Sequence, residues 1–536
     1  MSYSQLINPS GVGLIRPSRP TTHGSAEFLT HREAGKLPAL TQPNGGPFVG
    51  FLPSPARGGR DLSLYAPAPG HNATIAPTRA GKGVGHILPN LLSLQASAVV
   101  LDIKRENYDI SHAYRRTLGK VWCFDPERGD SDGWNPLNGI RVARTDSDDQ
   151  AEEQDDVLYL VDLLVAGSPA KDPYWDNAAK MVLALFVLHV CTAPLTDVRN
   201  GPGVTERTMA EVVRLLTLPA DLFAETVDAM FQSTHRLVRQ HAGMLRQTQQ
   251  SADQFTGVIS NAYEHVKVWG YDRVARVTRD STIDFGRMRR ERTTLYLCVP
   301  PEKIEQYRPV LRAMIGRAIQ DLKRGYAECR EPVFLFLDEF PQLGHLRPIE
   351  DMMAYGAGYA LYLWLFIQDL SQIQRHYAQS WRALIANATT RSFFGIRDLE
   401  TAKLVSEMIG QTTVAPRGFS ENEGHGLTFG ESTTQTRGGG ASRTYSPGLL
   451  WDKLQSRGVS ENWSESTTRS QTASLSAGSS TTLSYVGRRL ITPEELLSLD
   501  PLEQLVFIAG HKPIRAALLP YYRHPLLAER AGRWRG

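Results

Sequence analysis

The chain has 536 residues, which is too long for a single hydrophobic core and predicts two or three domains. Apolar residues make up 41% of the sequence and charged residues 21%, which is ordinary for a soluble globular protein. The 59 basic and 56 acidic residues leave a net charge of only +3. This balance excludes a globally basic nucleic-acid binder, so any surface for DNA or RNA has to be local.

The sequence predicts neither a membrane span nor a disulfide framework. No stretch approaches the roughly 18 to 20 continuous apolar residues that cross a bilayer, and the N-terminus has no hydrophobic signal region. The four cysteines are scattered without C-x-x-C spacing, which is typical of reduced core thiols in a cytosolic protein. We therefore expect a soluble, cytoplasmic chain without a transmembrane segment.

The first segment, residues 1–65, is rich in Pro, Gly and Arg and predicts an irregular N-terminal arm. A nucleotide-binding domain is expected to follow, with its first part at residues 66–183. Its most informative stretch is APTRAGKG, from Ala76 to Gly83. Small side chains at a strand-to-helix turn let backbone N–H groups surround a phosphate, and Gly81 permits that close approach.

Lys82 in this loop is expected to meet the β- and γ-phosphates of a nucleoside triphosphate. The usual pattern is G-x-x-x-x-G-K-[ST], whereas this chain has Ala76 first and Gly83 last, so no hydroxyl follows the lysine to ligate magnesium. That coordination position would fall to water or to another residue. The residues expected to bind the nucleotide are Pro77, Thr78, Arg79, Ala80, Gly81, Lys82, Gly83 and Val84.

The context favours this loop over the other Gly-Lys pairs, because a helix start at Val84–Leu92 and a hydrophobic strand at Ala96–Ile103 follow it. Another short strand is predicted at Lys120–Phe124. The acidic run Asp146–Asp156 then predicts the solvated start of a helix, with its carboxylates near the positive end of the helix dipole. These alternating elements indicate an α/β fold with a mostly parallel sheet covered by helices.

Residues 184–284 show helical spacing without a convincing strand, which predicts an all-α domain inserted into the sheet domain. Thr208 and Glu211 have the spacing of a capping box at one helix start. The second part of the nucleotide-binding domain is expected at residues 285–536, beginning with a strand at Thr293–Val299.

The apolar run Val333–Leu337 has the composition of a strand buried on both faces. Asp338 would then emerge at its carboxyl end, where open α/β sheets bind ligands, and is expected to hold magnesium directly or through water. Glu339 is placed to polarise the attacking water, since transfer of a γ-phosphoryl group depends on positioning and charge stabilisation. The alternative is a Gly-rich turn plus an unrelated acidic strand end.

Polar residues end several of the predicted strands. Asp102, Asp338 and Gln368 would come to one rim of the sheet, where the strands that precede them end. The later strands are predicted at Ala360–Ile367, Arg391–Ile396 and Gln504–Ala509.

Two features distinguish the chain after the strand at Arg391–Ile396. A helix is predicted with Asp398 at its cap and Gly410 at its C-terminal stop. Residues 415–486 are rich in Ser, Thr and Gly with few large apolar groups, which predicts a largely mobile segment because little burial offsets its ordering entropy.

Taken in order, the motifs resemble those of the coupling proteins of type IV secretion systems, the TraG/TraD-like motor ATPases that recruit conjugative DNA or effector proteins to the secretion channel. The Gly after the lysine is itself frequent in one branch of that family. The matching stretches are APTRAGKGVG (Ala76–Gly85), VVLDIKREN (Val99–Asn107), WNPL (Trp134–Leu137), DPYWDNAA (Asp172–Ala179), VFLFLDEFPQLG (Val333–Gly344), Gln368 and DLETAKLVSEMIG (Asp398–Gly410).

The resemblance implies a RecA-like P-loop domain interrupted by an all-α domain, and a homo-hexamer with ATP and Mg²⁺ at its subunit interfaces. It implies that Lys82 binds phosphate, Asp338 magnesium and Glu339 water. It also implies that Gln368 senses the γ-phosphate. The implied partners are DNA or secreted protein substrates, relaxase or adaptor proteins, and inner-membrane components of the secretion system.

A neighbouring subunit is expected by this resemblance to donate an arginine, and Arg391 and Arg397 are the candidates. Most family members carry an N-terminal membrane hairpin, and nothing before Gly24 could span a bilayer. Either the chain is an anchorless member that docks at the cytoplasmic face of the inner membrane, or residues were removed; Met1 favours the first.

Three functional hypotheses follow. The first is a coupling ATPase that hydrolyses ATP to present or move DNA or protein substrates. The second is a receptor or adaptor that binds nucleotide without hydrolysing it, which Gly83 motivates. The third is a DNA-segregation or end-processing motor with the same catalytic core, against which only the WNPL, DPYW and GSAEF (Gly24–Phe28) stretches argue.

Overall fold

The computed structural model describes residues 24–56, 58–142, 150–165, 173–414, 424–426, 435–440, 462–467, 476–478 and 486–532. The chain forms two compact units. The larger unit, which holds the main sheet, comprises Phe28–Ala402 and Glu494–Gly536. The smaller unit comprises Met1–Glu27 and Lys403–Pro493.

One eleven-stranded sheet organises the larger unit, in the order β2-β1-β17-β16-β9-β3-β8-β7-β4-β6-β5. From β9 to β5 every neighbouring pair is parallel, and from β2 to β9 every pair is antiparallel. The strands are β1 (Phe48–Leu52), β2 (Leu62–Tyr65), β3 (Asn72–Ile75), β4 (Ser97–Asp102), β5 (Lys120–Phe124), β6 (Thr293–Cys298), β7 (Val333–Leu337), β8 (Leu361–Ile367), β9 (Thr390–Phe394), β16 (Glu503–Ile508) and β17 (Ile514–Ala517).

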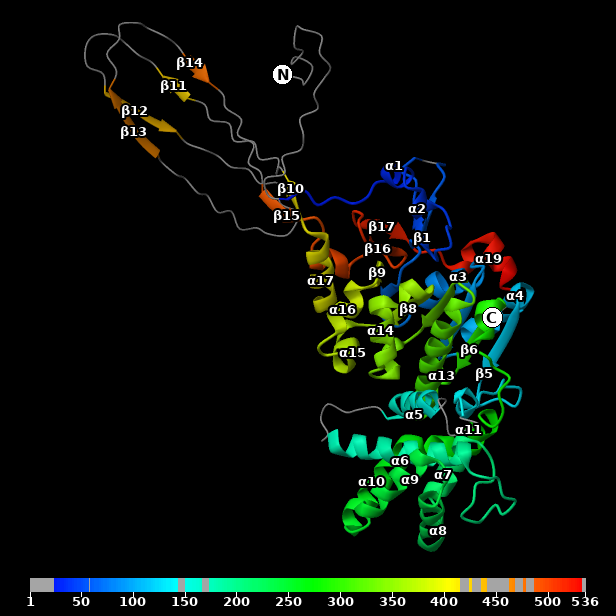
Figure 1. Cartoon of the computed structure of the whole chain (residues 1–536). Helices are drawn as coiled ribbons and strands as arrows, with labels where there is room; N and C mark the ends of the chain where they lie inside the picture. Colours follow the sequence, from blue (N-terminus) through cyan, green and yellow to red (C-terminus); the bar gives the residue numbers. More distant parts are fainter. Residues whose placement is uncertain are drawn as a thin grey trace. The chain divides into compact units, whose positions relative to one another are not determined.

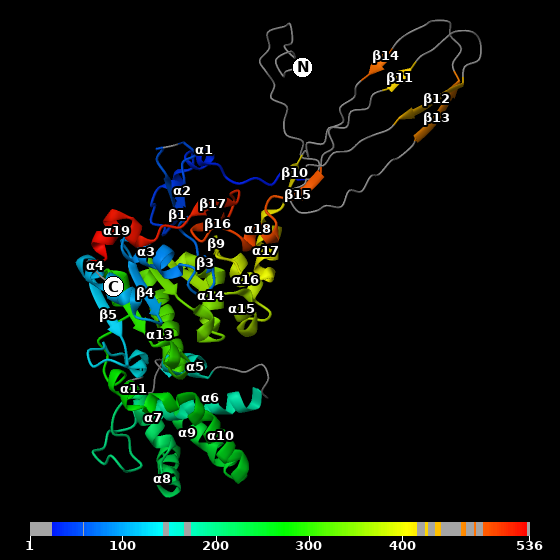
Figure 2. The same ribbon diagram turned by 180° about the vertical axis from the view of Figure 1, so that it is seen from behind.

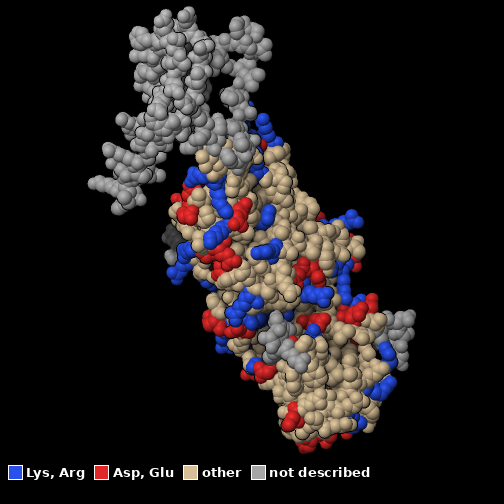
Figure 3. Space-filling view, turned by 90° about the vertical axis from the view of Figure 1, so that its left-hand side faces the viewer, with Lys and Arg blue, Asp and Glu red and all other residues tan. Residues whose placement is uncertain are grey.

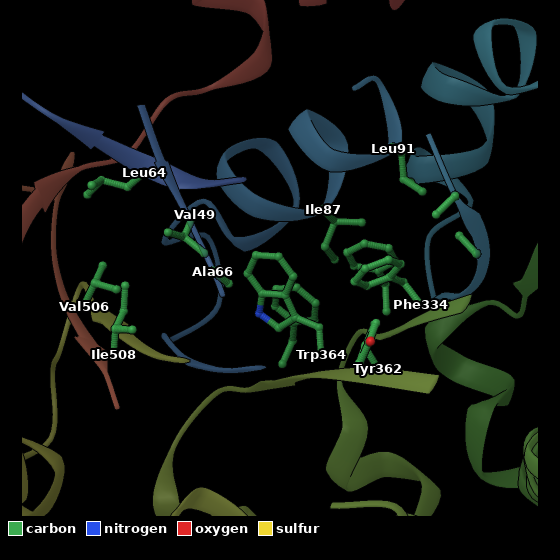
Figure 4. Close-up of a cluster of buried hydrophobic side chains, with 14 of the residues drawn as sticks. Val49, Leu64, Ala66, Ile87, Leu91, Phe334, Tyr362, Trp364, Val506 and Ile508 are labelled. Carbon is green, nitrogen blue, oxygen red and sulfur yellow. The ribbon is translucent and has the colours of Figure 1, made fainter. Parts of the chain in front are cut away.

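The strands predicted from long apolar runs are confirmed, because full burial on both faces leaves them no polar positions. All five residues of β7 and all seven of β8 are buried. Trp364 of β8 and Phe334 of β7 face Ile87 and Leu91 of the helical turns above the sheet, as Figure 4 shows. This layer of aromatic and aliphatic side chains fixes the parallel strands under the segment that follows β3.

The prediction of an irregular arm over residues 1–65 is wrong for the described part of that range. β1 pairs with β2, and its Phe51 lies opposite Ala517 of β17, so the start of the larger unit extends the sheet. The pattern was too short to detect, because each strand has only four or five residues and depends on a partner at the far end of the chain. Residues 1–23 lie outside the described residues.

Helices cover the sheet and form a separate layer at one end of the larger unit. In Figures 1 and 2, α6 to α10 pack together at the end of this unit away from β1 and α19. Between Pro173 and Val277 the described residues form helices and no strand of the sheet. These helices are α6 (Pro173–Thr192), α7 (Met209–Leu216), α8 (Ala220–Phe231), α9 (Arg236–Thr248), α10 (Ala252–Val266), η4 (Lys267–Gly270) and α11 (Asp272–Val277), and α5 (Gln150–Leu164) precedes them.

The capping box predicted at Thr208 and Glu211 is supported in its first half, since the Thr208 hydroxyl accepts from the Glu211 N–H at 3.1 Å. The domain limits at 66–183, 184–284 and 285–536 stay predictions. In the described residues no helix is both long enough and apolar enough to span a bilayer.

The remaining helical elements of the described residues range from single turns to the 21-residue α13. They are α1 (His31–Ala34), α2 (Pro38–Thr41), η2 (Gly83–Ile87), α3 (Leu88–Leu91), α4 (Glu106–Leu118), η3 (Pro136–Gly139), α12 (Arg287–Arg290), η5 (Pro301–Lys303), α13 (Ile304–Arg324), η6 (Gly325–Ala327), η7 (Phe340–Leu343), α14 (Arg347–Tyr355), η8 (Gly356–Tyr359), α15 (Leu370–His376), α16 (Trp381–Ala386), α17 (Leu399–Ile409), α18 (Pro493–Leu497), η9 (Tyr521–Arg523) and α19 (Pro525–Arg530).

The acidic run at the start of α5 is solvated only in part, since Glu152 and Asp155 are exposed while Glu153 and Asp156 are buried. Asp156 is fully buried and accepts hydrogen bonds from Arg141 (Nε, 2.8 Å) and Arg324 (Nη2, 2.6 Å). Burial alone would raise the pKa of Asp156, but these hydrogen bonds hold it below its ordinary value. Arg324 of α13 therefore fastens α5, and sequence spacing did not reveal this contact because Arg324 lies 168 residues from Asp156. Residues 146–149 lie outside the described residues.

α17 has the predicted cap and stop, since Asp398 Oδ1 accepts from the Thr401 N–H at 2.7 Å and Gly410 has a φ of +91°. In the smaller unit β10 (Gln411–Val414) pairs antiparallel with β15 (Val486–Arg489). Most of the segment 415–486, predicted to be mobile, lies outside the described residues. Within it the described pairs are β11 (Gly424–Gly426) with β14 (Ser476–Gly478) and β12 (Gln435–Gly440) with β13 (Asn462–Thr467).

Candidate nucleotide-binding site

A cavity of about 590 Å³ lies where β3, β8, β7 and β4 end. These four strands are adjacent and parallel, so their carboxyl ends meet at one edge of the sheet. The prediction that Asp102, Asp338 and Gln368 share one rim is confirmed. The cavity is lined by Pro77, Thr78, Arg79, Gly81, Lys82, Gly83, Val84, Leu88, Asp102, Ile103, Lys104, Glu106, Asn107, Ile110, Pro301, Ile304, Asp338, Glu339, Gln342 and Gln368.

The loop after β3 forms one wall of this cavity. Its backbone turns sharply, because Arg79 has a φ of +63° and Gly81 a φ of +103°. The Gly85 N–H donates to the Gly81 carbonyl at 2.8 Å and the chain enters the π-helical turn η2. A Cβ at Gly395 would lie 2.9 Å from the Cβ of Ala80, so the turn after β9 supports the loop through a glycine. Ala80 thus lies on the supporting side, and the other seven predicted loop residues line the cavity.

Lys82 connects this loop to the acidic strand end. Its Nζ donates to the Ala76 carbonyl at 2.9 Å and lies 3.6 Å from Glu339 Oε1. The side chain is only 7% exposed. The ammonium is therefore held at the inner end of the cavity, close to the acidic groups as the sequence predicted.

Glu339 is positioned from two sides. Gln368 Nε2 donates to Glu339 Oε2 at 2.6 Å, while Lys82 faces the other carboxylate oxygen. Glu339 has a φ of +50°, an unusual conformation for a residue with a side chain, which turns the chain sharply after β7. Such local strain persists only where surrounding contacts fix it, as the bonds to Gln368 and Lys82 do here.

Asp338 and Asp102 form an acidic pair on adjacent strands. Burial raises the pKa of Asp338 to about 6, the Glu339 carboxylate adds to this effect, and Lys82 opposes it. Asp102 is 1% exposed, and its burial raises its pKa to about 7, although hydrogen bonds from Tyr108 and Asn107 act in the opposite direction. Carboxylates are ligands that Mg²⁺ prefers, so the donor set at Asp338 fits a magnesium ion.

Gly83 occupies the position of the usual hydroxyl residue. An added Cβ at Gly83 would meet no atom within 4 Å, so crowding does not explain the glycine. The absence of a side chain leaves open space beside Lys82, and the carboxylates of Asp338 and Asp102, at the ends of β7 and β4, line the same cavity.

A chain of buried hydrogen bonds lies behind the loop. Trp364 Nε1 donates to Thr74 Oγ1 at 2.9 Å, which leaves the Thr74 hydroxyl free to donate to His86 Nδ1 at 3.0 Å. His86 Nε2 then lies 3.0 Å from Gln504 Oε1, and Gln504 Nε2 donates to the Val49 carbonyl at 2.7 Å. In this arrangement His86 Nδ1 accepts and Nε2–H donates to Gln504, which fits a neutral imidazole. Burial accordingly lowers the pKa of His86 to about 4.

The two arginine candidates do not line the cavity. Arg391 is half-buried on β9, where its guanidinium lies 5.9 Å from the Phe507 ring centre and burial lowers its pKa. Arg397 is exposed beyond the end of β9, two residues after Gly395, which packs against the loop. Their role toward a neighbouring subunit stays a prediction.

Asp102 lines the cavity and His86 lies behind the loop, and the sequence assigned a role to neither. A strand-end position marked Asp102, but nothing in the sequence indicates its contact with Asn107 and Tyr108. His86 gives no local signal, since one of its partners lies 418 residues away.

Comparison with known proteins identifies the family. A family model described as "Type IV secretory system Conjugative DNA transfer" matches residues 41–446 and 456–534, which is most of the chain. The chain belongs to this family. The resemblance to the type IV coupling-protein family noted in the sequence is thereby confirmed.

Curated relatives of this coupling-protein chain agree. It is 26% identical over 464 residues to "Protein VirD4" of Rhizobium radiobacter, covering 84% of this chain and 57% of that protein. It is 28% identical over 383 residues to "Conjugal transfer protein TraG" of Escherichia coli, covering 66% of this chain and 57% of that protein. The chain thus spans less than two thirds of the length of either relative.

Solved structures show the same fold. The bacterial conjugative coupling protein TrwBdeltaN70, in its trigonal form with sulphate, superposes with a TM-score of 0.61 at 14% identity, covering 92% of each chain. TrwB in complex with the ATP analogue ADPNP gives a TM-score of 0.55 at 13% identity, covering 84% of this chain and 85% of that one. The predicted α/β, RecA-like P-loop fold is confirmed.

Proposed function

We propose that this coupling protein binds ATP with Mg²⁺ in the cavity at the strand ends and hydrolyses it. The single observation that carries the proposal is the convergence of Lys82, Asp338, Glu339 and Gln368, which come from widely separated parts of the sequence, in one cavity. TrwB, which shares the fold, has been solved in complex with ADP and Mg²⁺, and this likeness supports the assignment of the cavity.

The chemistry assigned to each residue follows from its contacts. Lys82 binds the β- and γ-phosphates from the loop side. Asp338 would hold Mg²⁺, which when bound neutralises phosphate charge in the transition state. Glu339 accepts a hydrogen bond from the attacking water and orients it toward the γ-phosphate. Gln368, which bonds to Glu339, fixes that carboxylate and responds to the γ-phosphate.

Hydrolysis serves the recruitment of DNA or protein substrates, and their presentation or translocation to a secretion channel. We place the chain at the cytoplasmic face of the inner membrane, as a homo-hexamer that works with relaxase or adaptor proteins and with membrane components of the secretion system. Within the ring, Arg391 or Arg397 of one subunit reaches the nucleotide of the next, a contribution worth roughly 10³ to 10⁵ in rate in other phosphoryl-transfer enzymes.

On the face shown in Figure 3, Lys and Arg residues alternate with Asp and Glu residues over the described part of the chain. A continuous basic stripe would favour DNA, whereas this mixture is ordinary for a soluble surface.

Gly83 favours a second candidate, a receptor that binds nucleotide without turnover. Without a hydroxyl at this position, magnesium loses one protein ligand and γ-phosphoryl transfer loses part of its charge stabilisation. This candidate predicts tight binding of ATP and no phosphate release, with or without DNA.

Phosphate release distinguishes the two. We expect the wild-type chain to hydrolyse ATP, faster in the presence of DNA, and the Lys82→Ala and Glu339→Gln variants to release almost no phosphate. Lys120→Gln is the matched control, because Lys120 is exposed at the start of β5, away from the strand ends. Turnover that is unchanged in Lys82→Ala or in Glu339→Gln would contradict the proposed mechanism.

A further inference from the structure

We propose that Lys104 is a specificity-determining residue that contacts the γ-phosphate and makes the site prefer a nucleoside triphosphate to a diphosphate. The inference rests on the proposed function of the cavity. It assigns a role to a residue outside the loop and outside the acidic strand end.

Lys104 enters the cavity from the wall opposite the loop. It lies two residues after the end of β4, and β4 is the neighbour of β7 on the side away from β8. Asp338, at the end of β7, therefore lies between Lys82 on one side and Lys104 on the other. Lys104 also lines a second cavity of about 330 Å³, so it lies between this cavity and the first one.

The turn that carries Lys104 is held rigidly. Asp102 Oδ2 accepts from the Tyr108 N–H at 2.8 Å and Asp102 Oδ1 from Asn107 Nδ2 at 3.3 Å, which closes the turn between β4 and α4. Arg105 has a φ of +62°, an unfavourable conformation that these contacts stabilise. The turn thus fixes where the backbone of Lys104 lies relative to the cavity.

Arg105, the other cation of this turn, is already engaged by the protein. Its guanidinium forms ion pairs with Asp125 and with Asp109 and lies 4.4 Å from the centre of the Tyr108 ring. Lys104 is different. It is exposed, and among the described residues it makes no hydrogen bond or ion pair. Lys104 and Asp338 line the same cavity.

A free ammonium at this place suits the terminal phosphate. Lys82 already donates to the Ala76 carbonyl and faces Glu339, so its charge is partly neutralised by the protein. A nucleoside triphosphate adds a γ-phosphate with further negative charge beside Asp338, and a second cation on the far side would offset that charge. Lysine binds phosphate as a flexible point charge, which suits a position between the two cavities. A nucleoside diphosphate has no phosphate group at that distance from the loop.

The test compares the affinities for a non-hydrolysable ATP analogue and for ADP, each with Mg²⁺, by displacement of a fluorescent nucleotide. In Lys104→Gln we expect affinity for the ATP analogue to fall about tenfold or more, as for the loss of one hydrogen bond to a charged group, and affinity for ADP to be nearly unchanged. Lys104→Arg should retain most of the preference, and Lys120→Gln, which removes an exposed charge outside the cavity, should keep all of it.

The outcomes separate this inference from the proposed function. A fall confined to the ATP analogue supports it. Equal losses for both nucleotides, or no loss for either, in a wild-type chain that binds both, would overturn the role of Lys104 and leave the site assignment intact. A wild-type chain that binds neither nucleotide would contradict the proposed function, and this inference with it.

Discussion

Replacing Thr74 by valine should destabilise the sheet domain and loosen the phosphate loop, although the two side chains have nearly the same shape. The Thr74 hydroxyl accepts from Trp364 Nε1 and bonds to His86 Nδ1, and all three groups are buried. The valine variant leaves the Trp364 Nε1–H donor and the His86 Nδ1 acceptor without a hydrogen-bond partner. At about 1 to 3 kcal/mol for each such group, the free energy of unfolding should fall by about 2 to 6 kcal/mol.

Thr74→Ser is the matched control, since it keeps the hydroxyl and loses one methyl group, at a cost of about 1 kcal/mol. Thermal unfolding, followed by tryptophan fluorescence with and without Mg²⁺ and an ATP analogue, should rank the wild type above Thr74→Ser and Thr74→Ser well above Thr74→Val. Nucleotide affinity should follow the same order, because His86 lies in the turn directly after the loop. A valine variant as stable as the serine variant would refute the hydrogen-bonded chain.

Three further predictions concern the loop and its support. Gly83→Thr should strengthen Mg²⁺-dependent nucleotide binding relative to Gly83→Ala in a magnesium titration, because the position has room for a side chain. Equal affinities of the two variants would contradict the idea that a magnesium ligand is missing at position 83. Gly395→Ala should weaken nucleotide binding more than Gly510→Ala, because both glycines have a positive φ but only a side chain at 395 would press on Ala80. Equal losses of affinity in the two variants would show that backbone strain, and not the contact with Ala80, weakens nucleotide binding. Because burial lowers the pKa of His86 from 6.5 to about 4, its contribution to stability is full above about pH 6.5 and declines as the pH falls toward 4. Unfolding at a series of pH values should therefore show a shallower acid dependence in His86→Phe, and an identical slope would contradict the shift.

Much of the parallel part of the sheet was predictable because strands such as β4, β7 and β8 are apolar runs. β5 and β7 have the predicted limits, and β8 begins one residue later than predicted. The same patterns placed Asp338 and Gln368 at strand ends, and parallel strands bring such ends together. Local sequence therefore sufficed for the acidic side of the site.

The rest depends on contacts between distant segments. β1 and β2 are too short to have a pattern of their own, and they exist because β17, from the far end of the chain, pairs with β1. Asp156 was expected in solvent because the arginines that bury it come from another helix. The same limit applies to Lys104, whose position relative to Asp338 follows from the order of strands in the sheet and not from the chain order.

The central claim is that a nucleoside triphosphate binds where Lys82 faces Asp338 and Glu339. The most direct measurement is a crystal structure of the chain grown with Mg²⁺ and a non-hydrolysable ATP analogue. We predict phosphate density in the loop between Ala76 and Gly83, with its terminal phosphate next to Lys82 and a metal peak beside Asp338. Nucleotide density elsewhere on the chain, with this cavity filled only by solvent, would contradict the account.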